Sequence, residues 1–113
     1  MEFFLRRQNG VTVVALKGML DASTAPIFKK EMAVLIRDRT LRLVVDLKDV
    51  GFIDSTGLGA LISVLRQVHQ EGGDVKLARL QERIRAVFEL TRLDKVFDIC
   101  TDPEEAKRRF GSK

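Results

Sequence analysis

Cysteine and histidine are almost absent from this chain of 113 residues, which excludes several kinds of site. The single cysteine, Cys100, cannot form a disulfide within the chain, and one thiolate cannot build a metal cluster. The single histidine, His69, has no second histidine and no further cysteine with which to share a metal ion. We therefore expect a reducing compartment, no metal site and no cofactor. Cys100 is predicted to be a buried small hydrophobic residue at the end of a strand, and His69 a structural residue near the surface.

Tryptophan and tyrosine are absent as well, so the chain lacks the side chains on which single-stranded nucleic acids commonly stack. The chain is nevertheless basic, with a net charge of +4 and a pI near 9.6. Its basic residues are scattered, and most lie where the carboxyl end of a helix favours a cation. They include Arg6, Arg7, Lys29, Lys30, Arg37, Arg39, Lys107, Arg108 and Arg109. This scatter argues against direct binding of nucleic acid.

Long apolar segments are also missing, because no apolar run approaches the roughly 20 residues that a membrane-spanning helix requires. The first residues do not show the basic, apolar and small-residue pattern of a signal peptide. We therefore expect a cytoplasmic protein that does not insert into membranes. Apolar residues make up 45% of the chain, enough for the core of one domain, so residues 1–113 are predicted to form a single domain.

Hydrophobic periodicity predicts strands at residues 3–7 and 11–16, joined by a hairpin turn at Asn9-Gly10 and with Gly18 ending the second strand. Asp21, Ser23 and Thr24 are candidate caps for a helix that begins near Pro26 and ends near Arg39. The run at 41–47 is typical of a central strand.

In the second half of the chain, a helix with an apolar stripe from Leu58 to Val68 should stop at Gly72-Gly73. Further strands are predicted at 75–78 and 96–100, with a helix between them. A closing helix should begin at Thr101-Asp102-Pro103. The order β-β-α-β-α-β-α-β-α predicts an α/β fold in which helices flank a mixed sheet.

The segment 46–59, DLKDVGFIDSTGLG, is the most informative part of the chain. A buried strand runs into a tight turn with two adjacent hydroxyls, Ser55 and Thr56, and a helix begins at Gly57. The start of a helix has unpaired N–H groups and a partial positive charge, which favour an anion. A purely structural interpretation makes one hydroxyl the helix cap, which accounts for one of the two hydroxyls only.

Enzymatic interpretations find little support in these residues. The chain has no Walker-type phosphate loop and no nucleophile elbow around Ser55. His69 would lie on the same helix about 20 Å from Ser55, too far away to activate it. The glycine-lined helix start leaves weak binding of phosphate or nucleotide open.

The segment VVDLKDVGFIDSTGLGALI resembles the strand–turn–helix signature of STAS domains, and particularly that of bacterial anti-sigma factor antagonists. GMLDASTA at 18–25, GGDVKL at 72–77 and IRAVFELTRL at 84–93 are similar to other segments of this family, so the resemblance spans nearly the whole chain. It implies a STAS fold, with a mixed sheet flanked by helices.

The resemblance also implies a switch. The unphosphorylated protein would bind an anti-sigma factor, usually a serine kinase, and so release a sigma factor. The kinase would phosphorylate Ser55, with Thr56 as the alternative acceptor, and a serine phosphatase would reverse the modification. Asp21 and Asp54 would lie in two loops that face the partner. The basic pI departs from the acidic character of many family members.

Three interpretations therefore remain. The first is a phosphorylation-switched binding module, and the second is a STAS subunit bound statically in a larger assembly such as a lipid-transport complex or a stress-signalling scaffold. The third is a small enzyme or nucleotide-binding protein, which the absence of a base near Ser55 disfavours. In the first, the partner would contact both loops and an exposed helix face carrying Ala60, Ser63 and Gln67. The complete set of predicted partner-binding residues is Asp21, Ser23, Thr24, Asp54, Ser55, Thr56, Gly57, Ser63 and Gln67.

Overall fold

The computed structural model describes residues 1–111 and contains five strands and four α-helices in the predicted order, together with one short 3₁₀ turn that was not predicted. The elements are β1 (Glu2–Gln8), β2 (Val11–Leu20), α1 (Ala25–Arg37), β3 (Arg42–Ile53), α2 (Ser55–Gln70), β4 (Asp74–Ala78), α3 (Glu82–Leu90), η1 (Leu93–Lys95), β5 (Asp98–Cys100) and α4 (Pro103–Arg109).

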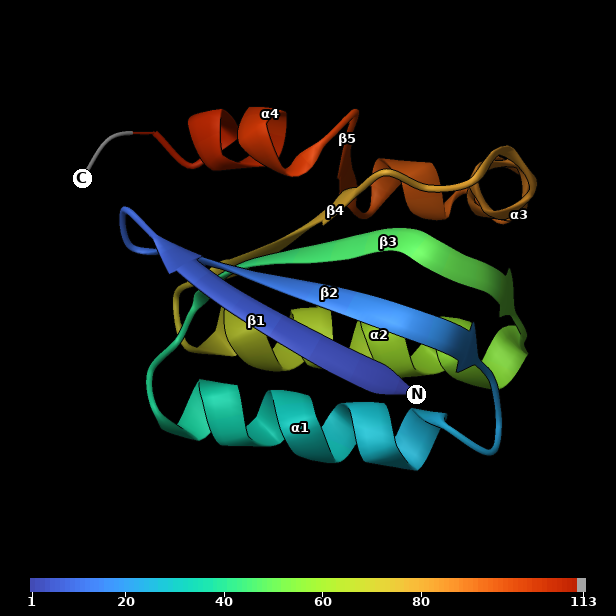
Figure 1. The fold of residues 1–113 in the computed structure, drawn as a ribbon, viewed down its shortest axis with the longest axis horizontal. Coiled ribbons are helices and arrows are strands. Elements are labelled where there is room, and N and C mark those ends of the chain that lie inside the picture. The colour runs from blue at the N-terminus through green and yellow to red at the C-terminus, as the bar shows by residue number, and fades with distance from the viewer. Residues whose placement is uncertain (112–113) are drawn as a thin grey trace.

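The strands form one mixed sheet in the order β1-β2-β3-β4-β5. β1 and β2 form an antiparallel hairpin, and β2, β3, β4 and β5 are parallel to one another. Asn9 and Gly10 both take positive φ, as the hairpin turn requires. Helices α1 and α2 cover one face of the sheet and α4 covers part of the other (Figure 1). The predicted α/β fold with a mixed sheet is confirmed.

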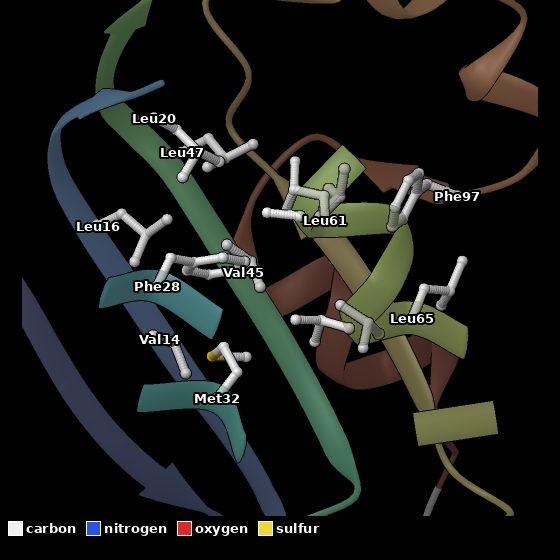
Figure 2. Packing of buried hydrophobic residues seen from close by; sticks show 14 of the residues in the cluster. Val14, Leu16, Leu20, Phe28, Met32, Val45, Leu47, Leu61, Leu65 and Phe97 are labelled. Atoms are coloured by element: carbon white, nitrogen blue, oxygen red, sulfur yellow. The ribbon is translucent and has the colours of Figure 1, made fainter. Parts of the chain in front are cut away.

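The larger part of the core lies between the sheet and the helices α1 and α2. Figure 2 shows Phe28 and Met32 of α1 against Val14 of β2 and Val45 of β3, and all four side chains are buried. A smaller cluster packs α4 onto the opposite face and includes Cys100, the last residue of β5. Cys100 is 1% exposed, and burial raises the pKa of its thiol, so its predicted packing role is confirmed.

Three predicted strand boundaries are wrong. β2 does not end at Gly18 but continues to Leu20, and β3 does not end at residue 47 but continues to Ile53. The two extensions pair with each other through register shifts on either side of Gly18, whose φ of +126° few other residues adopt. The last strand does not span 96–100: β5 has only three residues, because pairing with β4 is confined to them.

The two ends of the described chain lie at opposite ends of the sheet (Figure 1). Met1 lies beside Gly18, near the end of β2. After α4, the backbone oxygen of Phe110 accepts a hydrogen bond of 2.7 Å from Arg42, at the beginning of β3. The ring of Phe110 is contacted by two cations, the guanidinium of Arg42 at 5.2 Å and the ammonium of Lys76 at 4.6 Å. These contacts fix the chain after α4 to the amino ends of the parallel strands.

A partly buried ion pair joins β3 to the loop after β4. Asp46 is 3% exposed, and its carboxylate accepts two hydrogen bonds from Arg79, one of them 3.1 Å long from Nε. A third hydrogen bond comes from the backbone N–H of Lys48. The bonds to Asp46 raise the pKa of Arg79, whose side chain is 40% exposed. Arg79 makes them from a backbone with φ +57°, which is unfavourable for a residue with a Cβ.

Replacing Arg79 should therefore destabilise the fold. We expect Arg79→Met to lower the free energy of unfolding by roughly 2 kcal/mol, less than for a fully buried pair because Arg79 is partly in water. Urea unfolding followed by circular dichroism measures the change. Arg85→Met, at an exposed position of α3, is the matched control and should stay within about 0.5 kcal/mol of the wild type. Equal stability of the two variants would show that the ion pair contributes nothing.

Candidate functional site

The candidate site lies where β3 passes into α2. Asp54 has extended backbone angles and caps the helix: its Oδ1 accepts a hydrogen bond of 2.8 Å from the N–H of Gly57. The structural interpretation in which Ser55 or Thr56 caps the helix is therefore wrong, because the cap is the residue before them. Both hydroxyls are exposed, and neither makes a hydrogen bond within residues 1–111. An acidic cap thus leaves two hydroxyls unengaged in the first turn of a 16-residue helix.

The second oxygen of Asp54 reaches the neighbouring loop. Oδ2 accepts a hydrogen bond of 3.1 Å from the N–H of Ala22, in the loop between β2 and α1. The backbone N–H of Asp54 also donates to the carbonyl of Leu20, at 3.3 Å. The two loops predicted to face a partner are therefore adjacent, and one carboxylate holds them together.

The loop between β2 and α1 is ordered by its own side chains. The Oδ1 of Asp21 accepts hydrogen bonds from the hydroxyl of Ser23 at 2.7 Å and from its N–H at 3.0 Å. The hydroxyl of Thr24 donates to the carbonyl of Met19 at 2.7 Å and accepts from the N–H of Asp21 at 3.0 Å. The bond from the Ser23 hydroxyl is the main cause of a lowered pKa at Asp21. Asp21 therefore stays ionised and organises the loop, while the Ser23 side chain faces solvent.

Gly57 allows α2 to begin directly against β2. A Cβ at this position would lie 2.1 Å from the carbonyl oxygen of Leu20 and 2.8 Å from its carbonyl carbon. Gly57 is buried and brings the helix and the strand together, and its predicted contact with a partner stays a prediction.

The exposed face of α2 is narrower than predicted. Gln67 is exposed and Ser63 half-buried, but Ala60 is buried at 3% exposure, so its predicted place on this face is wrong. Because α2 packs beside α1 as well as on the sheet, its buried surface extends beyond a single apolar stripe. Ser63 and Gln67 lie about 12 and 18 Å along the helix from Ser55, at 1.5 Å per residue.

Two exposed apolar residues near the site were not predicted. Met19 and Phe52 precede Leu20 and Ile53, which are paired across β2 and β3 and point into the core. Both residues lie where a register shift interrupts the pairing of β2 with β3, and both are exposed, Met19 at 55% and Phe52 at 48%. Their exposure could be deduced only once both strands were known to continue past Gly18 and residue 47. They place exposed apolar side chains close to the polar first turn of α2.

The single histidine lies away from this site. His69 lies in the last turn of α2 and bonds to Asp74 at 2.9 Å, far from Ser55. Within residues 1–111 no group of three potential metal ligands occurs. None of the helices described is long and apolar enough to cross a membrane. The site offers two free hydroxyls at a positive helix end, two ordered acidic loops and exposed apolar side chains.

Comparison with known families identifies this arrangement. The model of the STAS domain matches residues 3–106. The chain belongs to the STAS domain family. The site at residues 54–59, DSTGLG, lies within the matched range.

Similar proteins narrow the family. The anti-sigma-B factor antagonist of Bacillus subtilis is 34% identical over 91 residues, which cover 80% of this chain and 83% of that protein. The crystal structure of an anti-sigma factor antagonist from Mycobacterium paratuberculosis is 28% identical, with a TM-score of 0.86, and the match covers 96% of this chain and 92% of that chain.

The STAS fold also occurs outside this group. A sulfate transporter family protein from Wolinella succinogenes gives a TM-score of 0.75 at 18% identity, covering 86% of this chain and 81% of that chain. The backbone fold alone therefore does not separate a regulator from a part of a transporter, and the function has to be argued from the site.

The contact between Gly57 and Leu20 can be tested with a pair of glycine variants. Gly57→Ala places a methyl group on the Leu20 carbonyl, and we expect a loss of about 3 kcal/mol in unfolding free energy. Gly59→Ala meets no atom within 4 Å and should stabilise α2 by up to about 1 kcal/mol. Thermal unfolding of both variants measures the difference. Similar melting temperatures of the two variants would mean that Gly57 is not in close contact with the Leu20 carbonyl.

The bridging role of Asp54 can be tested by hydrogen exchange. Asp54→Ala should cost about 1–2 kcal/mol, the range for loss of a helix cap, and should speed amide exchange at both Ala22 and Gly57. Asp49→Ala removes an exposed carboxylate from β3, the strand that precedes Asp54, and should leave both amides unchanged. Faster exchange at Gly57 alone would contradict the coupling of the two loops.

Proposed function

We propose that this STAS protein is a cytoplasmic anti-sigma factor antagonist that is switched by phosphorylation. The unphosphorylated form binds an anti-sigma factor of the serine kinase class, and the sigma factor is thereby released. The kinase phosphorylates Ser55, and a serine phosphatase restores the active form. The 34% identity to an anti-sigma-B factor antagonist supports this role.

The observation that carries the proposal is the free hydroxyl of Ser55. A kinase needs an acceptor hydroxyl that is exposed and not already bonded within the fold. Ser55 has both properties because Asp54 occupies the cap position. Thr56 shares them, and Ser55 is preferred as the first helical residue, next to the loop that carries Asp21 and Ser23.

The partner footprint should centre on this helix start. Ser55, Thr56 and Ser23 provide exposed polar groups, and Met19 and Phe52 provide apolar area of the kind that anchors an interface. The exposed side of α2 extends the same surface through Ser63 and Gln67. Asp21 and Asp54 contribute by fixing the two loops, since their carboxylates are engaged in hydrogen bonds within the site.

Phosphorylation should act on the complex and leave the fold unchanged. A phosphoserine carries about −1.5 to −2 charges at pH 7. The positive end of α2 favours that charge by about 0.3–1 kcal/mol, and repulsion from the adjacent Asp54 offsets part of the gain. A partner surface fitted to a neutral hydroxyl would instead meet an unpaired dianion. Desolvation and like-charge contact each cost several kcal/mol, which corresponds to at least about a hundredfold loss of affinity.

The proposal is tested by capturing partners from a lysate of the native organism with wild type and Ser55→Asp as baits. The wild type should retain a protein with a serine kinase fold, and Ser55→Asp should lose it. Ala86→Asp adds the same charge at an exposed position of α3 and should behave as the wild type. Incubation of the captured kinase with ATP should place phosphate on Ser55, as mapped by mass spectrometry of the peptide.

Other outcomes are equally specific. Phosphate on Thr56 would move the acceptor by one residue. Retention of a transporter ATPase or a large scaffold, unaffected by Ser55→Asp, would overturn the switch and favour a static STAS subunit. A fall of many degrees in the melting temperature of the phosphorylated protein would show that phosphate acts through the fold.

A further inference from the structure

Strand β1 leaves one edge of the sheet unpaired. It is the outermost strand and is bonded to β2 on one side only, and among residues 1–111 no helix or strand covers its other side (Figure 1). Six of its seven residues are exposed, including two large apolar ones, Phe4 at 55% and Leu5 at 49%. An exposed edge strand offers a row of free N–H and C=O groups to another strand, and proteins usually protect such an edge. What could pair with β1 follows from its sequence.

The sequence of β1, EFFLRRQ, is complementary to itself in one antiparallel register. When Phe4 lies opposite Phe4 of a second copy, Glu2 of each copy faces Arg6 of the other, and Phe3 faces Leu5. Opposite charges directly across two strands attract, and facing apolar side chains pack. Within residues 1–111 neither Glu2 nor Arg6 takes part in an ion pair, so both are available. A charged residue such as Arg6 usually keeps an edge strand from pairing with another chain, but in this register Arg6 lies opposite the Glu2 carboxylate of the second copy.

The side chains on each face of β1 are compatible with this register. Alternation places Phe3 and Leu5 on the side of α1, where they line a groove together with Glu31 and Val34. In the paired arrangement, Phe3 and Leu5 of the second copy would continue this apolar strip across the boundary. A two-fold axis perpendicular to the sheet places α1 of both copies on the same face of the joined sheet. With such an axis, antiparallel strands can pair only in registers in which one residue, here Phe4, lies opposite its own copy.

We propose that β1 is a homodimerisation edge, at which two copies join their sheets antiparallel about a two-fold axis at Phe4. The result is a continuous ten-stranded sheet with α1 of each copy on the same face. The contact is one strand and a narrow apolar strip, so the dimer is weak and depends on concentration. Ser55 follows β3, two strands from the paired edge, so each copy keeps its site open.

Disulfide trapping tests the position of the axis. Phe4→Cys puts two thiols opposite each other, with Cα atoms about 4.5–5.5 Å apart, within reach of a disulfide. With oxidised glutathione as oxidant, this variant should form a covalent dimer in non-reducing electrophoresis. Arg6→Cys is the control and should stay monomeric, because its two copies lie about 13 Å apart along the strands. The native Cys100 is 1% exposed and does not compete.

A charge exchange tests the register without any cysteine. Sedimentation equilibrium of the wild type should give a molecular mass that rises with concentration. Arg6→Glu or Glu2→Arg alone should weaken the dimer at least about fivefold, and the double variant should restore it. Rescue is diagnostic because the two positions lie four residues apart on one strand and cannot pair within one copy. Arg85→Glu, on α3, controls for the change in net charge and should not alter the association.

The proposal fails if the wild type stays monomeric at every concentration and Phe4→Cys gives no covalent dimer. It also fails if the wild type dimerises and the double variant remains as weak as the single ones, since another surface would then hold the copies together. Melting temperatures of all variants exclude unfolding as the cause of a loss.

Discussion

The geometry of the site depends on the carboxylate of Asp54. One of its oxygens accepts a hydrogen bond from the first turn of α2 and the other from the loop before α1, while its own N–H reaches the end of β2. Residues 20–22 and 54–57, two segments that are distant in the sequence, thus meet at Asp54. Because the acid serves as the cap, the hydroxyl of Ser55 has no structural task and remains accessible to other molecules.

The sequence was sufficient for the order of the elements and for those ends that local chemistry determines. Asn9-Gly10 specifies a tight turn, and Asp102 with Pro103 specifies the start of α4, where the Asp102 carboxylate accepts from Glu105. The prediction failed where pairing between distant strands decides. Residues 48–53 have no clean alternation, and they are a strand only because the end of β2 lies beside them. The length of β5 is also determined by pairing between strands, because β4 pairs with residues 98–100 and not with residues 96 and 97.

The site was predicted to a similar extent. The turn, its two hydroxyls and the neighbouring loop follow from the motif, and the structure brings them together. The motif does not reveal which residue caps the helix. Asp54 and Ser55 are both residues that commonly cap helices, and only the backbone conformation determines which of them does so. Ala60 was misplaced because the contact of α2 with α1 is invisible in the periodicity of one helix. Met19 and Phe52 were missed because their exposure depends on the irregular pairing between the ends of β2 and β3.

The position of the chain ends has a practical consequence for any experiment that holds the protein on a surface. Met1 lies beside Gly18, at the same end of the sheet as Ser55, whereas the cations Arg42 and Lys76 fix Phe110 at the far end. A tether or fusion joined ahead of Met1 would crowd the hydroxyls and the outer edge of β1. One joined beyond α4 would point the site away from the support and leave both surfaces open to solution.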